Sequence, residues 1–357
     1  NSGCGSWLME GQSTNLITQS EAFDNAYWVK NSSTVTSGFI SPDGTLNAYK
    51  IIANANNSAT AHSIYHNPGF SITSGLDYTT TAYLKYDNQQ YARLELGSTG
   101  GMGLPLSQRS VIVDLINGTI NTPVSPAKAT IKKFTGGFYE VSLTTTPAAS
   151  GVTSSGISFT DALGNNIITN GNESIIAFGI QAEALSYATS YIPTQGASST
   201  RLQDIATNSG NASLINSEEG VLYAEISALA NDGTYRGLCL SNGSSSNRVL
   251  IYLNNGNNQL RANVVAQGNL QANLIYTVSD VTILNKVAIR WSLNNVSFWI
   301  NGSKVLQDLD ALLMPAGLNE LSFDSNGAGG EKFFGKIKAV AVYKTALTDE
   351  QLTLLTT

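Results

Sequence analysis

Residues 175–201 read IIAFGIQAEALSYATSYIPTQGASSTR, and this stretch decides the fold. Its first part alternates between Ile176, Phe178, Ile180 and Ala182 at one set of positions and Ala177, Gly179, Gln181 and Glu183 at the other. A period of two is typical of a strand with one face on a core, so we expect Gln181 and Glu183 to point away from the core. Pro193 has no amide hydrogen to give to a sheet and biases Ile192 toward an extended conformation. We therefore predict the last core strand of one β-module, followed by a strap that leaves it.

A family resemblance is carried by this stretch and by two others. Residues 179–201 are similar to the segment that closes a β-sandwich module common in bacteriophage tail-fibre and other virion-surface proteins. Residues 10–30, EGQSTNLITQSEAFDNAYWVK, resemble the opening of that module, and SPDGTLNAYKI follows at 41–51. Its middle is represented by GFYEVS at 137–142, where Phe138 and Glu140 stand in place of the usual Trp and Arg. This departure implies that a ligand bound there would differ from that of relatives.

The second half of the chain reads as another sandwich. Short alternating segments bounded by Asn and Gly turns, the pattern of an antiparallel sandwich, occur at Arg236–Leu240, Arg248–Leu253, Gln259–Ala266, Asn285–Ser292 and Val296–Ile300. Residues 218–226, 286–305 and 333–355 resemble the laminin-G-like or concanavalin-like lectin fold. Near the end, Thr348 as N-cap and Gln351 at the third helical position form a capping box, which predicts one short helix.

The predicted fold class is all-β, with two antiparallel β-sandwich domains in tandem and one short C-terminal helix. The first domain, residues 1–203, is expected to be a jelly roll similar to a carbohydrate-binding module. The second, residues 204–357, is expected to be a laminin-G-like or concanavalin-like lectin sandwich. A length of 357 residues suits two domains of ordinary size.

Composition limits the partners. Charged residues make up 12% of the chain and hydrophobic residues 42%, so the chain can bury real cores under a surface of neutral polar residues. The net charge of -6 and the absence of clustered Lys and Arg argue against a nucleic-acid partner. No apolar run approaches the roughly 18 residues that span a bilayer, so we expect no membrane insertion.

The termini and cysteines suggest where the protein is made. Cys4 and Cys239 stand alone in different predicted modules, and we expect both to be free thiols, as in a protein assembled in a reducing cytoplasm. We find no signal peptide. The first residue is Asn1 rather than Met, from which we expect a fragment or a processed chain.

Residues 78–97, YTTTAYLKYDNQQYARLELG, contain the strongest candidates for glycan contact. They read as two strands joined by a turn at Asp87–Gln90, with Ala82, Leu84, Ala92, Leu94 and Leu96 facing inward. The outward face would then combine aromatic rings with hydrogen-bonding charges, as carbohydrate recognition requires. The glycan-binding candidates are Tyr83, Lys85, Tyr91, Arg93 and Glu95, together with the outward Gln181 and Glu183. The alternative is a solvated sheet face with cross-strand salt bridges.

Three further features have more than one interpretation. Trp28 is either a core side chain or a platform for a sugar ring. His62 and His66 lie about 13 Å apart if they share a strand, too far to bind one metal ion. The loop that carries Asp324, Asn326 and Glu331 offers oxygen ligands for calcium, although such a Gly-rich loop is commonly just solvated; otherwise we expect no cofactor.

Catalytic motifs are missing from the sequence. There is no GxSxG elbow, neither Cys has a neighbouring His, and no alternating carboxylate triplet of a sandwich glycosidase occurs. We therefore expect no enzyme activity.

The leading functional hypothesis, implied by the resemblance, is a virion-surface protein such as a tail fibre, tailspike tip or head fibre that recognises bacterial cell-surface polysaccharide. Other virion subunits would be its partners, and it would be a homo-oligomer, possibly a trimer. One alternative is a structural spacer of the virion without a ligand of its own. Another is an extracellular bacterial glycan-binding protein.

Overall fold

The computed structural model describes residues 5–97, 101–121, 128–207, 209–253, 257–325 and 330–357. The chain forms two compact units, each built of antiparallel sheets, which confirms the predicted all-β sandwich class. We call Gln12–Leu202 the first module, and Asn1–Gly11 together with Gln203–Thr357 the second module. The sequence-based boundary assigned residues 1–203 to one domain, whereas the N-terminal strand β1 (Trp7–Met9) pairs with the last strand of the second module, β29 (Gly335–Tyr343).

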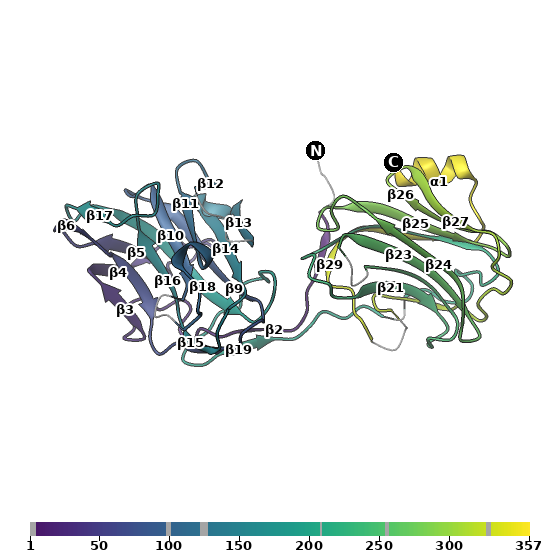
Figure 1. Cartoon of the computed structure of the whole chain (residues 1–357), viewed down its shortest axis with the longest axis horizontal. Helices are drawn as coiled ribbons and strands as arrows, with labels where there is room; N and C mark the ends of the chain where they lie inside the picture. Colours follow the sequence, from purple (N-terminus) through teal and green to yellow (C-terminus); the bar gives the residue numbers. More distant parts are fainter. Residues whose placement is uncertain (1–4, 98–100, 122–127, 208, 254–256, 326–329) are drawn as a thin grey trace. The chain divides into compact units, whose positions relative to one another are not determined.

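The first module contains two six-stranded sheets (Figure 1). The β18 sheet has the order β13 (Lys128–Lys133), β14 (Tyr139–Thr145), β9 (Tyr78–Tyr86), β18 (Ser174–Glu183), β5 (Ala48–Ala53) and β4 (Ser33–Phe39). The β10 sheet has the order β12 (Thr119–Ile120), β11 (Ser110–Asp114), β10 (Tyr91–Leu96), β16 (Ser155–Phe159), β7 (Ser63–His66) and β3 (Trp28–Asn31).

Shorter elements complete the first module. Three two-stranded pairs are formed by β15 (Gly151–Thr153) with β8 (Phe70–Ile72), β17 (Ile167–Thr169) with β6 (Asn56–Thr60), and β19 (Ser199–Arg201) with β2 (Ser13–Asn15). Two 3-10 turns lie at Leu106–Gln108 and Thr135–Gly137. Hairpins at Asn117-Gly118 and Gly136-Gly137 join β11 to β12 and β13 to β14.

The core of the first module lies between its two sheets. It includes the predicted inward residues Ala82, Leu84, Ala92, Leu94 and Leu96. Trp28 also belongs to it, with 1% of its surface exposed, and its indole N–H donates to the Gln19 carbonyl at 2.8 Å. Trp28 is therefore a core side chain and not a platform for a sugar ring.

A bulge at Gly179 corrects the predicted faces of the deciding strand. Gly179 has φ +55, and the register of β18 against β9 shifts between Phe178 and Gln181. One extra residue exchanges the faces of a strand. Ile175 and Ala177 therefore face the core before the bulge and Ile180 and Ala182 after it. Ile176 and Phe178, predicted to face that core, lie instead in a separate cluster on the outer face.

His66, at the end of β7, is held neutral inside this module. Its Nε2 accepts the Ser155 N–H at 2.9 Å, and its Nδ1 lies 3.0 Å from both the Pro68 carbonyl oxygen and the Tyr27 hydroxyl. The ring stacks between those of Tyr27 and Phe70 at centroid distances of 5.2 and 5.6 Å. Burial lowers the pKa of His66 to about 4.

The second module also has two sheets. The β20 sheet has the order β1, β29, β20 (Gly220–Ala228), β25 (Asn285–Trp291), β26 (Val296–Ile300) and β27 (Ser303–Asp308). The β22 sheet has the order β24 (Asn269–Thr277), β23 (Gln259–Ala266), β22 (Arg248–Leu253), β21 (Arg236–Ser241) and β28 (Glu320–Ser322). The five predicted strands of this half match β21, β22, β23, β25 and β26 to within one residue.

The outer faces of these two sheets differ. Helix α1 (Asp349–Thr356) covers the outer face of the β20 sheet, where Leu352 joins a cluster with Val221, Tyr223, Ala288 and Trp299 (Figure 1). The predicted capping box is confirmed: Thr348 Oγ1 accepts the Gln351 N–H, and Gln351 Oε1 accepts the Thr348 N–H. No helix in the described part of the chain is long and apolar enough to cross a membrane.

We expect Gly179→Ala to destabilise the first module. A Cβ at Gly179 would lie 2.9 Å from the Tyr191 ring, and a side chain at positive φ is strained as well, so the free energy of unfolding should fall by more than about 1 kcal/mol. Thermal unfolding of the full chain would measure this. Gly75→Ala is the matched control, because Gly75 has φ +80 with nothing within 4 Å of its Cβ position. Equal losses in the two variants would contradict the clash with Tyr191.

We expect the first module to lose stability as the pH falls from about 6.5 to about 4. The unfolded chain protonates His66 near its ordinary pKa, while the folded chain resists until about 4, so protons favour unfolding within that window. The lowered pKa of His66 corresponds to a contribution of about 3 kcal/mol to the free energy of unfolding. This contribution is fully present above about pH 6.5 and is lost by about pH 4. Hydrogen exchange of β7 and β16 in the full chain would report it.

The control for this measurement is His66→Gln, which cannot titrate. Burial raises the pKa of Glu183, whose contribution to stability therefore declines as the pH rises through its folded value. That contribution is common to both proteins and cancels in the comparison. A pH slope in His66→Gln as steep as in the unsubstituted chain would show that His66 is not responsible.

Candidate functional site

The predicted outward face of residues 78–97 is not one face. Strands β9 and β10 belong to different sheets, so the turn at Asp87–Gln90 carries the chain across the sandwich instead of closing a hairpin. It is fixed there by the backbone N–H groups of Asn88 and Gln89, which both donate to the Ser174 carbonyl at 2.9 Å. Because the inner faces of both strands meet in the core, their outer faces point in opposite directions, and the predicted cross-strand arrangement is wrong.

Tyr83 and Lys85 lie on the outer face of the β18 sheet. Tyr83 is 5% exposed and packs among aromatic rings, at centroid distances of 5.1 Å from Phe134 and 5.9 Å from both Phe178 and Tyr191. The Lys85 ammonium lies 5.6 Å from the centroid of Phe138. Tyr83 is thus buried in a structural cluster, and Lys85 covers the edge of that cluster.

Tyr91, Arg93 and Glu95 share the outer face of the β10 sheet, where they are largely paired among themselves. Glu95 lies 3.7 Å from Arg93 and 3.8 Å from Arg109, and it accepts from Ser158 Oγ at 3.3 Å. Arg93 Nη1 donates to the Gly164 carbonyl at 3.1 Å. Arg93 and Glu95 are each 8% exposed, whereas Tyr91 is half-buried. The alternative of a solvated sheet face with cross-strand salt bridges is met only in part, because the charged side chains are paired but buried, and Arg93 and Glu95 lie on the same strand.

Gln181 and Glu183 point away from the core as predicted, yet the strap covers them. Gln181 Oε1 accepts the Ile192 N–H at 2.6 Å. Glu183 is fully buried and accepts from Ser13 Oγ at 2.5 Å, from the Thr189 N–H at 3.1 Å and from the Thr189 hydroxyl. These two residues hold the strap against the sheet and are not available to a glycan.

The calcium candidates do not come together in the described residues. Asp324 is 1% exposed and its Oδ1 accepts from Ser322 Oγ at 3.3 Å and from Cys239 Sγ at 3.8 Å. Glu331 is exposed, and Asn326 lies outside the described residues. No group of three His, Cys, Asp or Glu side chains in the described part of the chain could hold a metal ion. Cys239 is buried and forms no disulfide among the described residues, and Cys4 lies outside the described residues.

A better candidate site lies on the outer face of the β22 sheet. Leu260, Ala262 and Val264 of β23 face the core, so the alternate residues Arg261 and Asn263 face outward. On β22, Arg248, Leu250 and Tyr252 share this outer face, and Tyr235 packs beside Tyr252. We call Tyr235, Arg248, Tyr252, Arg261 and Asn263 the tyrosine–arginine face.

Tyr252 is the centre of the tyrosine–arginine face. Its hydroxyl accepts from Arg261 Nη1 at 2.9 Å and from Asn263 Nδ2 at 3.4 Å, and the Arg261 guanidinium lies 5.4 Å from the ring centroid. The Tyr235 ring lies 6.0 Å away at an interplanar angle of 35°. Rings with fixed donors and acceptors at their edges suit a sugar, which has apolar C–H faces and a rim of hydroxyls.

The tyrosine–arginine face is only partly open to solvent. Tyr252 and Asn263 are each 7% exposed, and Asn263 Oδ1 is buried without a hydrogen-bond partner among the described residues. Tyr235, Arg248 and Arg261 are half-buried, so these three side chains are the ones that a ligand could contact. The strand Gln259–Ala266 was predicted from the sequence but this site was not, although the alternation of Arg261 and Asn263 with apolar residues was a visible signal.

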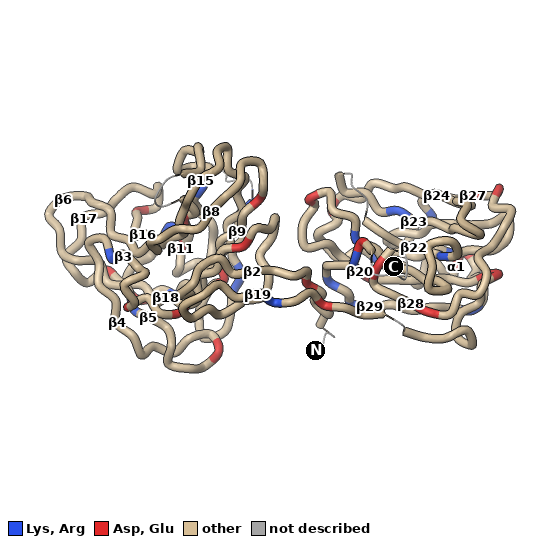
Figure 2. The backbone as a smooth tube through the Cα atoms, turned by 90° about the horizontal axis from the view of Figure 1, so that it is seen from below, with Lys and Arg blue, Asp and Glu red and all other residues tan. Residues whose placement is uncertain are grey.

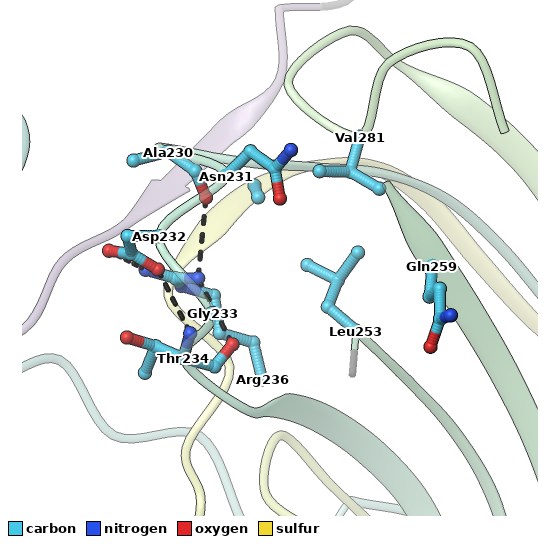
Figure 3. A pocket seen from close by; sticks show the side chains of 10 residues that line it. Ala230, Asn231, Asp232, Gly233, Thr234, Arg236, Leu253, Gln259 and Val281 are labelled. Carbon is cyan, nitrogen blue, oxygen red and sulfur yellow. Dashed lines mark hydrogen bonds and ion pairs between the residues drawn. The ribbon is translucent and has the colours of Figure 1, made fainter. Parts of the chain in front are cut away.

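Two hollows of the second module are less suitable. Figure 3 shows a cavity of about 10 Å³, room for about one water molecule, where Arg236 pairs with Asp232 at 2.8 Å opposite Leu253 and Val281. A shallow apolar groove of about 310 Å³ beside α1 is lined by Tyr343, Leu347, Gln351, Leu354 and Leu355. The cavity is too small for a sugar, and the groove has few polar groups to orient one.

Comparison with known proteins gives distant likenesses only. No protein-family model and no curated protein matches the chain. Among solved structures, it is similar to the CBM40 module of the Ruminococcus gnavus IT-sialidase bound to α2,3-sialyllactose, at 17% identity and a TM-score of 0.36 over 43% of this chain and 95% of that one.

Two other solved structures are similar at the same level. One is a heptameric SAP-like pentraxin from Limulus polyphemus, at 14% identity and a TM-score of 0.34 over 42% of this chain and 74% of that one. The other is sheep galectin-11, at 10% identity and a TM-score of 0.26 over 40% of this chain and 99% of that one. At identities and TM-scores this low, the likeness carries no argument about a ligand.

We expect Glu183→Ala to destabilise the first module by at least about 2 kcal/mol, because the buried donors of Ser13 and Thr189 would lose their acceptor. Glu183→Gln, which keeps one acceptor oxygen, should cost less. Urea unfolding followed by circular dichroism would rank the variants. A Glu183→Ala protein as stable as the unsubstituted chain, with glycan binding lost, would return Glu183 to the set of ligand contacts.

Proposed function

We propose that this chain is a non-catalytic glycan-binding protein of a virion surface, such as a tail fibre, tailspike tip or head fibre, that recognises bacterial cell-surface polysaccharide. The observation that carries the binding role is the tyrosine–arginine face, where the half-buried Tyr235 ring packs beside Tyr252, and the half-buried Arg248 and Arg261 have no carboxylate partner among the described residues. The resemblance of residues 10–30 and 179–201 to phage fibre modules supports the location.

The two sheets of the second module differ in what covers their outer faces, and this difference supports the same role. Helix α1 packs on the β20 sheet, and the tyrosine–arginine face lies on the other sheet. A rigid antiparallel sheet holds side chains of neighbouring strands at fixed separations, so ligand contacts there require little ordering on binding. We further propose that the chain associates with other virion subunits and with copies of itself, for example as a trimer.

The binding role predicts that Tyr235→Ala weakens glycan binding about fivefold to tenfold, the value of one lost ring contact. Tyr235 is half-buried and outside the main core, so the fold should persist. The measurement is binding of the purified chain to an array of bacterial polysaccharides and to whole cells. The matched control is Tyr86→Ala in the first module, a tyrosine 40% exposed and remote in sequence from the site.

Other outcomes would identify the alternatives. Absence of binding to every glycan and cell would favour a structural spacer. Release of reducing sugar from a bound polysaccharide would contradict the non-catalytic role. Tyr235→Ala binding as tightly as Tyr86→Ala would move the site away from the tyrosine–arginine face.

A further inference from the structure

The two arginines of the tyrosine–arginine face differ from other arginines of the chain in their partners. Arg93, Arg236 and Arg290, all largely buried, lie 3.7, 2.8 and 2.7 Å from a carboxylate. Arg248 and Arg261 are half-buried, and neither lies within salt-bridge distance of an acid in the described residues. Arg248 Nη1 donates to the Ser325 carbonyl, and Arg261 Nη1 donates to the Tyr252 hydroxyl. Neither guanidinium therefore has a counter-ion among the described residues.

Acids lie along the β21 and β28 side of this face. Glu320 is in the same cross-strand row as Arg248, because Ser241 of β21 pairs with both, and its carboxylate accepts from Ser241 Oγ at 3.0 Å. Asp324 accepts from Ser322 and Cys239, and the carbonyl of the exposed Glu331 accepts the Gly237 N–H.

Arg261 lies farther from these acids. Glu320 is three strands away from β23, which corresponds to about 14 Å between the backbones at Glu320 and Arg261. The sequences of β22 and β23 (Figure 2), RVLIYL and QLRANVVA, contain one arginine each and no acid. The part of the face around Arg261 is therefore its cationic part.

The two arginines lie on either side of Asn263. Asn263 is two residues from Arg261 on β23 and pairs with Leu250, which is two residues from Arg248 on β22. Asn263 Oδ1 is buried, so the charged groups that a ligand can contact here are the two half-buried guanidinium groups, which are suited to an anion. A ligand with an acidic group would supply the carboxylate or phosphate partner that neither arginine has among the described residues.

We propose that the ligand of the tyrosine–arginine face is an acidic oligosaccharide, in which a carboxylate or phosphate group is bound by Arg261 and, in a longer oligosaccharide, a second such group is bound by Arg248. This inference rests on the glycan-binding role proposed above and narrows it to anionic sugars. Charge-assisted hydrogen bonds from a guanidinium are stronger than neutral ones and weaken as salt rises.

The test uses the full chain and matched pairs of ligands. Binding to a carboxylate is tested by two comparisons, sialyllactose with lactose and oligogalacturonate with its carboxyl-reduced form. Binding to a phosphate is tested by comparing a phosphorylated bacterial polysaccharide with its dephosphorylated form. We expect the acidic member of one pair to bind at least about tenfold more tightly, and this advantage to shrink in high salt. Calorimetry and a glycan array would measure both.

Substitutions assign the effect to residues. Arg261→Gln should remove most of the preference for the acidic ligand, and Arg261→Lys should restore part of it, because an ammonium keeps the charge and loses the planar fork. Lys336→Gln, at an exposed cation of β29, is the matched control and should leave the preference intact. Circular dichroism and a melting curve show whether each variant folds.

Every outcome decides between the two proposals. Equal binding of acidic and neutral members by the unsubstituted chain would overturn the acidic-ligand inference and leave the glycan-binding role standing. Absence of binding to any sugar would overturn both. An acid preference that Arg261→Gln retains while folded would place the anion contact outside the tyrosine–arginine face and so overturn the assignment. If Arg261→Gln does not fold, the ligand pairs on the unsubstituted chain and the same change at Arg248 decide.

Discussion

Each strand of a β-sandwich has one face on the core between the two sheets, and the side chains on its other face must either be covered by another segment or be exposed to solvent. This constraint governs both modules. In the first module the bulge at Gly179 moves Ile176 and Phe178 to the outer face, so that face must bury apolar rings of its own. The strap that returns across it contributes Tyr191, and its Ile192 and Thr189 N–H groups donate to the side chains of Gln181 and Glu183. The outer face of the β18 sheet is thus part of the structural interior.

The second module applies the same constraint differently to its two sheets. Helix α1 covers Val221 and Tyr223 on one sheet, and the salt bridges of Asp349 with Arg290 and Lys304, at 2.7 and 2.8 Å, hold its first turn in place. The other sheet keeps Tyr252, Arg261 and Asn263 on its outer face, and helix α1 packs on the opposite sheet. The proposed ligand would cover this second face as the helix covers the first.

Much of the fold follows from local patterns in the sequence. Alternation places Ala92, Leu94 and Leu96 in the core, Asn-Gly turns mark the hairpins, and the capping box at Thr348 starts the helix, because these signals act over a few residues. The sheet to which a strand belongs depends on contacts with residues far away in the sequence, and the sequences of β9 and β10 do not indicate it. A single Gly with positive φ inverted the faces of β18, and only the strap at Thr189 reveals that Glu183 is buried. The sequence did not predict the role of Arg261, because the absence of a carboxylate beside it depends on how distant segments fold together.

The pairing of β1 with β29 makes the first module an insertion within the second. The edge strand of the second module is synthesised first and its partner nearly last, so a ribosome would release a complete first sandwich before the other could close its sheet. The Glu10 N–H donates to Asp204 Oδ2 at 2.8 Å, and the Asp204 N–H donates to the Glu10 carbonyl at 2.9 Å. These two hydrogen bonds join the segment just before the first module to the segment just after it. A chain trimmed to begin at residue 204 would leave one side of β29 without its neighbour, an unprotected edge of the kind that promotes self-association.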